Sequence, residues 1–239
     1  MVEVFAVKIE KEPDHFKIDK LLTYVSKQKY DKISKFMDVA GAMRATTADL
    51  IVRYLACRKL NLRNEQLVFA VNSHGKPFLR NHKGFQFNIS HSGDLVVCAV
   101  DYLSVGIDVE LIDKPHLEVA KRFFTRDEYR DLISKEGFER VSDFYRLWTL
   151  KESYIKAVGR GLSIPLNSFS IQVKNGHYVV EGTGQRKENY FLKQYDVGND
   201  YKLAVCSPNN KFVSKVIMLG FDGFYEEVTA VLDMTKYKN

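Results

Sequence analysis

Apolar and polar residues follow two repeating patterns along this chain, and each pattern predicts a different kind of element. Short runs that are apolar throughout, or that alternate with polar residues, predict strands; they are residues 2–9, 67–71, 85–90, 95–100 and 105–111. Longer runs with apolar residues three and four apart predict amphipathic helices; they are residues 18–37, 44–60, 113–124 and 142–158. The mixture of the two kinds predicts an α+β fold.

The last part of the chain is rich in strand signals. The expected strands are residues 168–173, 177–181, 191–197, 201–206 and 213–219. Beyond them, residues 223–239 have a helical pattern and a basic end, which predicts a peripheral tail with a frayed terminus.

The order of elements in the first part of the chain recurs faintly in the second part. A helix at residues 44–60 precedes a hairpin that closes with residues 95–100, and a helix at residues 142–158 precedes hairpins that close with residues 201–206. We therefore predict a pseudodimer of two similar α+β halves with a cleft between them. Its parts are residues 1–104, residues 105–219 and a tail of residues 220–239.

The composition is that of an ordinary globular protein with an excess of basic residues. The 239 residues are 45% apolar and 28% charged, with a net charge of +6, which suggests an acidic partner or an anionic substrate. No stretch has the ~18 uncharged apolar residues of a membrane span, and the N-terminus lacks a signal-peptide pattern. Cys57, Cys98 and Cys206 lie in apolar runs, so we expect buried free thiols in a reducing cytoplasm.

Three acids and a lysine form the most specific chemical pattern. Asp108 and Glu110 are two apart in an apolar strand, so they point to one face. Glu152 and Lys156 are four apart in a helix, so they also share a face. Three carboxylates that could meet at one point predict a Mg²⁺ site in the second half, with Lys156 beside the phosphate that the metal would hold. The alternative is ordinary solvation of the acids and a surface Glu152–Lys156 pair.

Lys151 falls on the apolar side of the same helix, so it either extends its ammonium to solvent or neutralises a buried acid. Ser142 is the residue that we expect to cap the start of this helix.

Two polar stretches in the first half are candidates for anion binding. Ser90 and His91 follow an alternating strand, and with Gly93 they either bind phosphate or close a hairpin as an ordinary turn. Lys76 precedes Pro77, which keeps the chain extended and leaves the Lys76 backbone open to a ligand.

Two basic surfaces are also predicted. Lys29 and Lys32 lie in the basic part of the helix at residues 18–37, which is either a solvated face or a rim facing an anion. Residues 115–135 predict a helix hairpin. Asp113 caps its first helix, Pro115 stands early in that helix, and a capping box at Thr125 opens the second helix. Its basic and aromatic side chains suit an acidic partner or form a plain solvated pair of helices.

With these motifs in place, the chain resembles the 4′-phosphopantetheinyl transferases, specifically the longer, surfactin-synthetase-activating (Sfp-type) group. The resemblance extends from about residue 4 to residue 207. It rests mainly on three stretches, Phe87-Asn88-Ile89-Ser90-His91-Ser92, Gly106-Ile107-Asp108-Val109-Glu110 and Trp148-Thr149-Leu150-Lys151-Glu152-Ser153-Tyr154-Ile155-Lys156.

The resemblance implies transfer of 4′-phosphopantetheine from coenzyme A to a serine of an apo carrier protein by a monomer. It implies Mg²⁺ on Asp108, Glu110 and Glu152. Coenzyme A would contact residues from both halves, namely Lys29, Lys32, Arg44, Lys76, Pro77, Ser90, His91 and Lys156. Glu152 is implied as the general base, with Lys156 stabilising charge and Lys151 holding the acids in place. An acidic carrier protein would dock on residues 115–135.

Two other functions compete with this interpretation. A metal-dependent nuclease would also use clustered acids, a lysine and a basic surface. A basic binding module for an acidic protein would leave the acids merely solvated. Neither explains the Ser90-His91 and Lys76-Pro77 motifs together with the acids, so we expect no nucleic-acid partner and no membrane partner.

Overall fold

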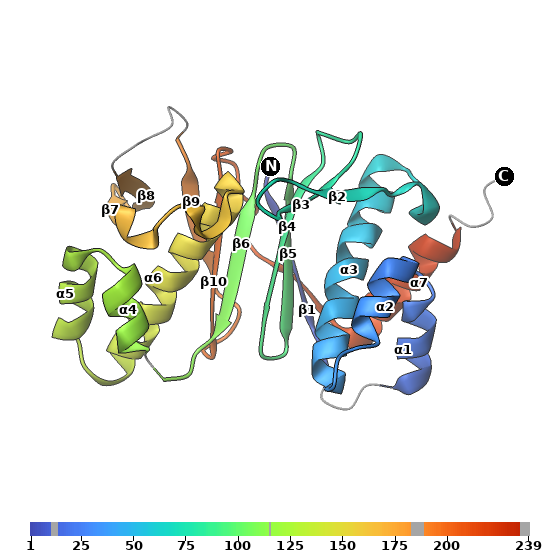
Figure 1. The fold of residues 1–239 in the computed structure, drawn as a ribbon, viewed down its shortest axis with the longest axis horizontal. Helices are drawn as coiled ribbons and strands as arrows, with labels where there is room; N and C mark the ends of the chain where they lie inside the picture. Colours follow the sequence, from blue (N-terminus) through green and yellow to red (C-terminus); the bar gives the residue numbers. More distant parts are fainter. Residues whose placement is uncertain (11–13, 115, 183–188, 235–239) are drawn as a thin grey trace.

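Two sheets meet in the middle of the molecule, and helices cover their outer sides (Figure 1). This computed structural model describes residues 1–10, 14–114, 116–182 and 189–234. One sheet has the strand order β11-β1-β5-β4 and the other has the order β6-β10-β9-β8-β7. All pairs are antiparallel except β1 with β11. The predicted α+β pseudodimer is confirmed.

The first half is built around a 22-residue helix, α3. Its elements are β1 (Glu3–Lys8), α1 (His15–Leu22), α2 (Lys27–Ile33), α3 (Val39–Leu60), β2 (Phe69–Val71), β3 (Pro77–Leu79), β4 (Gln86–Ser92) and β5 (Leu95–Asp101). The single helix predicted over residues 18–37 is wrong. The Ser26 side chain accepts a hydrogen bond from the Lys29 N–H and starts α2 as a separate helix.

The second half is built around another 22-residue helix, α6. Its elements are β6 (Gly106–Leu111), α4 (Leu117–Phe123), α5 (Arg126–Ser134), α6 (Gly137–Val158), β7 (Phe169–Lys174), β8 (His177–Gly182), β9 (Phe191–Tyr195) and β10 (Tyr201–Ser207). The capping box at Thr125 is confirmed. Two predicted helix starts are wrong: α6 begins at Gly137 rather than at Ser142, and α4 begins at Leu117 rather than at Asp113. Pro115 lies outside the described residues.

The C-terminal segment returns to the first half, as Figure 1 shows from the position of α7. Strand β11 (Ile217–Gly220) pairs in parallel with β1, and α7 (Phe221–Met234) packs against α3. Four apolar side chains of α7 are buried in the core of the first half; they are Phe221, Phe224, Val228 and Leu232. The prediction of a peripheral tail is therefore wrong for residues 221–234, and residues 235–239 lie outside the described part.

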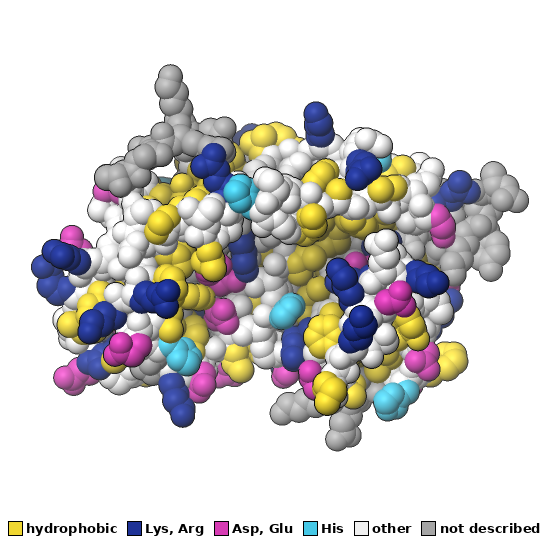
Figure 2. Space-filling view, viewed as in Figure 1, with side chains coloured by type: hydrophobic (Ala, Val, Ile, Leu, Met, Phe, Trp, Pro, Cys, Tyr) yellow, Lys and Arg dark blue, Asp and Glu magenta, His cyan; other side chains and the backbone are white. Residues whose placement is uncertain are grey.

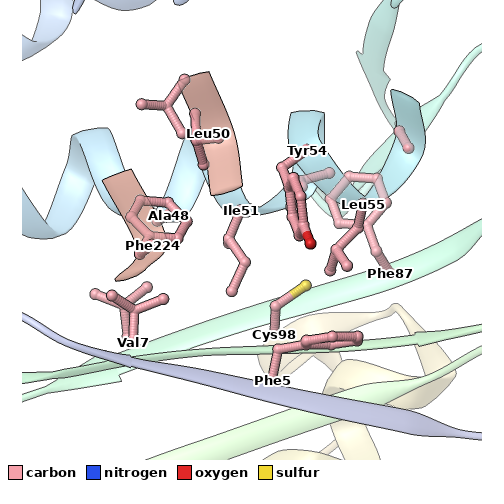
Figure 3. Close-up of a cluster of buried hydrophobic side chains, with 14 of the residues drawn as sticks. Phe5, Val7, Ala48, Leu50, Ile51, Tyr54, Leu55, Phe87, Cys98 and Phe224 are labelled. Atoms are coloured by element: carbon pink, nitrogen blue, oxygen red, sulfur yellow. The ribbon is translucent and has the colours of Figure 1, made fainter. Parts of the chain in front are cut away.

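Strand β5 divides its side chains between two apolar cores, since successive strand residues point to opposite faces. Val96 and Cys98 face α3 in the core that Figure 3 shows. Val97 and Ala99 face the second half and pack in a layer that includes Ile107 of β6. This shared apolar layer joins the two halves. No helix among residues 1–10, 14–114, 116–182 and 189–234 is long and apolar enough to cross a membrane.

Burial of α7 predicts a large loss of stability when its core contacts are removed. The side chain of Phe224 is 0% exposed, so Phe224→Ala should lower the free energy of unfolding by about 3–5 kcal/mol. Urea unfolding followed by circular dichroism would measure the difference. Met234→Ala on the same helix is the control, because Met234 is 62% exposed. Equal stability of the two variants would contradict the packing of α7.

Candidate active site

The site is assembled where β6 lies directly on α6, with no side chain between the two backbones. A Cβ atom at Gly106 would lie 2.1 Å from the carbonyl oxygen of Ser153 and 2.3 Å from the amide nitrogen of Ala157. No residue with a side chain fits there, so glycine is required for this close approach. The approach brings the acids of β6 next to Glu152 and Lys156 of α6.

Asp108 is the most buried of the three acids, with 3% of the residue exposed. Its Oδ1 accepts hydrogen bonds from Ser90 Oγ at 2.9 Å and from Lys156 Nζ at 2.5 Å. Its Oδ2 is buried, and no described residue donates a hydrogen bond to it. Burial raises the pKa of Asp108, although Lys156 acts in the opposite direction. A buried carboxylate oxygen without a partner is costly, and a cation held at this oxygen would offset that cost.

Glu110 and Glu152 are half-buried beside Asp108. Ser92 Oγ donates a hydrogen bond to Glu110 Oε2 at 3.0 Å. Burial and the negative charge of Asp108 raise the pKa of Glu110, and the same two causes raise the pKa of Glu152 to about 7. Lys156 is the cation that opposes the shift at all three acids. Three carboxylates around one ammonium leave an excess of negative charge.

The three acids do not form a finished metal site as their side chains stand. Within residues 1–10, 14–114, 116–182 and 189–234, no three acidic, imidazole or thiol side chains are placed to hold one ion together. The donor set nevertheless fits Mg²⁺, which prefers carboxylate oxygens. The free Oδ2 of Asp108 supplies a ligand atom that is already desolvated.

Ser90, His91 and Ser92 lie within β4 rather than in the polar turn that the sequence predicted. The turn begins after them, at Gly93. Three alternate residues of β4 face β6 across the junction of the two halves. Ser90 and Ser92 bind the acids, and Asn88 Oδ1 accepts a hydrogen bond from the Ile107 N–H at 2.9 Å. The first half therefore orients the acids that the second half supplies.

His91 lies beside three basic side chains, Arg44, Lys156 and Lys29, which we call the basic wall of the site. Burial lowers the pKa of His91, and the positive charges of Arg44, Lys156 and Lys29 lower it further. These residues come from α3, α6 and α2, so the three helices present their cations to one place. Lys32 is exposed one turn after Lys29 on α2. Figure 2 shows a hollow between the two halves with acidic, basic and histidine side chains on its walls.

Lys76 does not have the open backbone that the sequence suggested. Its N–H donates to Asn72 Oδ1 and its carbonyl oxygen accepts from the Asn72 N–H, both at 2.9 Å. Its ammonium turns away from the acids and donates to backbone carbonyls of α6 and of the segment before β6. Pro77 follows as the exposed first residue of β3.

Lys151 directs its ammonium away from the three acids, toward α5 and the start of β7, so the expectation that it holds the acids in place is wrong. Its ammonium is 2.8 Å from Glu128 Oε2 of α5 and also donates to the carbonyl oxygens of Leu166 and Phe169. Burial lowers the pKa of Lys151, and Glu128 opposes that shift. The other interpretation of Lys151, neutralisation of a buried acid, is confirmed with Glu128 as the acid.

Comparison with known proteins shows what this arrangement belongs to. Residues 10–103 match the model of the 4′-phosphopantetheinyl transferase N-terminal domain, and residues 104–206 match that of the 4′-phosphopantetheinyl transferase superfamily. The chain belongs to the 4′-phosphopantetheinyl transferase family. It is 33% identical to the 4′-phosphopantetheinyl transferase Sfp of Bacillus subtilis over 222 residues, 92% of this chain and 99% of the relative.

A second transferase is similar over most of its length. The 4′-phosphopantetheinyl transferase gsp of Aneurinibacillus migulanus is 39% identical over 207 residues, 87% of this chain and 86% of the relative. A solved holo-(acyl-carrier-protein) synthase from Bacillus anthracis, in complex with CoA (3′,5′-ADP), is 16% identical with a TM-score of 0.39. The match covers 44% of this chain and 93% of the synthase chain. The resemblance to the Sfp-type transferases is confirmed.

Several residues of this transferase site were not singled out from the sequence. Asn88 and Ser92 could have been found, because each is two residues from Ser90 on a predicted strand and so shares its face. Glu128 and Asn72 carried no such signal. Their roles depend on partners far away in the chain, Lys151 for Glu128 and α6 for Asn72.

The Gly106 contact predicts that even a methyl group disrupts this family member. Gly106→Ala should force β6 away from α6, lower the free energy of unfolding by about 1–3 kcal/mol, and reduce phosphopantetheine transfer. Chemical denaturation and a transfer assay would measure both effects. Gly220→Ala is the matched control, because a Cβ there meets nothing within 4 Å. If Gly106→Ala behaves like Gly220→Ala, the backbone contact does not shape the site.

Proposed function

We propose that this chain transfers 4′-phosphopantetheine from coenzyme A to a serine hydroxyl of an apo carrier protein and releases adenosine 3′,5′-bisphosphate. The observation that carries the proposal is the group of three half-buried to buried carboxylates with Lys156 at the junction of the two halves. A basic wall stands beside this group. Such a site suits a substrate that is itself a polyanion and that binds together with a cation.

Coenzyme A would lie with its phosphates toward the basic wall. Arg44 and Lys29 are both close enough to His91 to lower its pKa, which supports a shared phosphate site. Lys32 would extend this wall on α2. Ser90 contributes its hydroxyl from β4, and the loop before Pro77 would flank the adenine.

Mg²⁺ is the metal that we propose for this site, held by Asp108, Glu110 and Glu152. The oxygen-only donor set and the unpartnered Oδ2 of Asp108 support it. When bound, Mg²⁺ would neutralise negative charge that develops on the pyrophosphate.

Glu152 and Lys156 have different roles in the proposed transfer reaction. The serine oxygen forms a bond to the β-phosphorus of coenzyme A, and the bond from that phosphorus to the bridging oxygen of the pyrophosphate breaks. Glu152 is our candidate for the base that takes the serine proton, directly or through a water molecule. A carboxylate that also binds a metal has a lowered pKa, which favours proton transfer through a water molecule over direct transfer. Lys156 stabilises the negative charge that develops.

The carrier protein would dock on the hairpin of α4 and α5, residues 115–135. Arg130 pairs with Asp127, and Lys135 pairs with Asp131. Those pairs offset part of the hairpin's basic charge. The exposed basic side chains around the partly buried Phe123 would meet an acidic partner; they are Lys121, Arg122 and Arg126.

Carrier proteins of peptide, polyketide and fatty-acid synthesis all present a serine for this chemistry, so each class is a candidate substrate. We further propose that the chain acts as a monomer in the cytoplasm. Its cysteines support a reducing compartment, because Cys57, Cys98 and Cys206 are buried free thiols.

The function predicts a defined mass change in the acceptor. An apo carrier protein incubated with this protein, coenzyme A and Mg²⁺ should gain roughly one phosphopantetheine, and EDTA should abolish the gain. Intact-mass spectrometry would measure it, with apo peptidyl, polyketide and fatty-acid carriers tested in parallel. A gain that persists in EDTA would contradict the metal proposal. No gain with any carrier would contradict the function, and cleavage of DNA with Mg²⁺ would then favour a nuclease.

The base assignment predicts a large and specific loss. Glu152→Gln should leave the fold intact and lower kcat by about 10²- to 10⁴-fold, because the amide cannot take the serine proton. Glu139→Gln is the control, since Glu139 is exposed near the start of the same helix. Steady-state transfer kinetics and a thermal melt would be compared. Near-full activity of Glu152→Gln with Mg²⁺ would show that another group is the base.

A further inference from the structure

The C-terminal end of α6 is capped by residues that precede the second half in the chain. The last carbonyl groups of a helix have no partner within the helix and need donors from elsewhere. Lys76 Nζ donates to the carbonyl oxygen of Lys156 at 2.7 Å and to that of Ala157 at 3.3 Å. The Ser104 hydroxyl also donates to the Ala157 carbonyl. The first half thereby supplies donors that α6 lacks.

Lys76 also fixes the segment that leads into β6. Its ammonium donates to the carbonyl oxygen of Val105 at 2.9 Å and lies 3.4 Å from Ser104 Oγ. One ammonium group therefore joins the start of β6 to the end of α6, immediately next to Gly106. A lysine has three N–H donors, and the carbonyls of Val105, Lys156 and Ala157 can occupy all of them.

The loop that carries Lys76 is shaped for this contact. Asn72 Oδ1 accepts the N–H groups of His74 and Lys76, which closes the loop on itself. The Asn72 side-chain amide donates to the carbonyl oxygen of Gly159 at 2.8 Å. Gly159 ends α6 in the left-handed conformation with φ 74°, and a Cβ there would lie 3.0 Å from Lys76 Cδ. The loop and the helix end fit each other closely.

Backbone dipoles compensate for the charge of Lys76. The C-terminal end of a helix carries partial negative charge and favours a cation. Burial lowers the pKa of Lys76 to about 8. The hydrogen bonds to backbone carbonyls offset the cost of burying this ammonium.

We propose that Lys76 is a positioning residue: together with Asn72 it clasps the C-terminal end of α6 to the first half and thereby holds Lys156 beside Asp108. The backbone of Lys156 is bound by Lys76, while its side chain reaches Asp108 and Ser90. The clasp thus sets the place of the lysine that serves the reaction. It also joins the loop proposed for the adenine to the catalytic helix.

The test separates positioning from direct contact with coenzyme A. Lys76→Met keeps the length of the side chain and removes its donors. The clasp predicts that kcat falls about 10- to 100-fold while KM for coenzyme A changes less than about threefold, since a misplaced group costs rate. Lys215→Met, which removes an exposed lysine before β11, is the charge-matched control. A rise in KM of tenfold or more with kcat retained would overturn the proposal, because it would mark Lys76 as a phosphate contact.

Chemical rescue provides a second readout. Lys76→Cys treated with 2-bromoethylamine regains an ammonium at nearly the original length, and its kcat should recover most of the loss. Selective alkylation is practical because the native Cys57, Cys98 and Cys206 are 3% exposed or less. Burial also raises the pKa of each native thiol, which keeps it unreactive. Complete alkylation without recovery of kcat would overturn the proposal.

If Lys76→Met does not fold, Asn72→Ala provides a second test of the clasp. Asn72 carries no charge to offer a phosphate, so a lowered kcat in this variant supports the clasp and an unchanged kcat overturns it. The inference rests on the proposed function, so the wild-type protein is assayed first on the same carrier. If the wild-type protein transfers nothing, both the proposed function and the clasp are contradicted. If the wild type is active and the variants have the same kcat as the wild type, only the clasp is contradicted.

Discussion

The backbone contact between β6 and α6 at Gly106 is the constraint on which the rest of the site depends. At this position no side chain separates the strand from the helix. The acids of β6 and of α6 therefore share one buried space, where burial raises the pKa of all three and the charge of Asp108 raises the pKa of Glu110 and of Glu152 further. A group of like charges in such a space is stable only with cations, and Lys156 supplies one of them.

The first half completes what the second half cannot provide alone. Ser90 and Ser92 of β4 hydrogen-bond two of the acids, and Lys76 occupies carbonyls at the end of α6. Apolar packing of β1 and β5 against β6 and β10 joins the two sheets, and β4 lies beside β6. The return of the chain through β11 and α7 closes the core behind β1 and α3, so the element farthest along the sequence stabilises the half that starts it.

The sequence was sufficient for those parts of the site that follow from local spacing. Asp108 and Glu110 share a strand face, and Glu152 and Lys156 share a helix face, because the periods of strand and helix require it. It was insufficient where the partner comes from another element. Glu128 binds Lys151 across 23 positions of the chain, and no periodicity links the two. The tail was misjudged for the same reason, since the apolar face of α7 is explained by its packing against distant elements of the first half, chiefly α3.

Three lysines near α6 show how burial separates structural from reactive charge. Lys151 is 0% exposed and balanced by the carboxylate of Glu128, so its ammonium is committed to joining α5 to α6. Lys76 is balanced by backbone carbonyls, which also commits it. Lys156 is bound to Asp108 but keeps 27% of its side chain exposed at the basic wall. Of these three, Lys156 alone combines an acid of the site with access to a ligand, and its charge is the one available to the reaction.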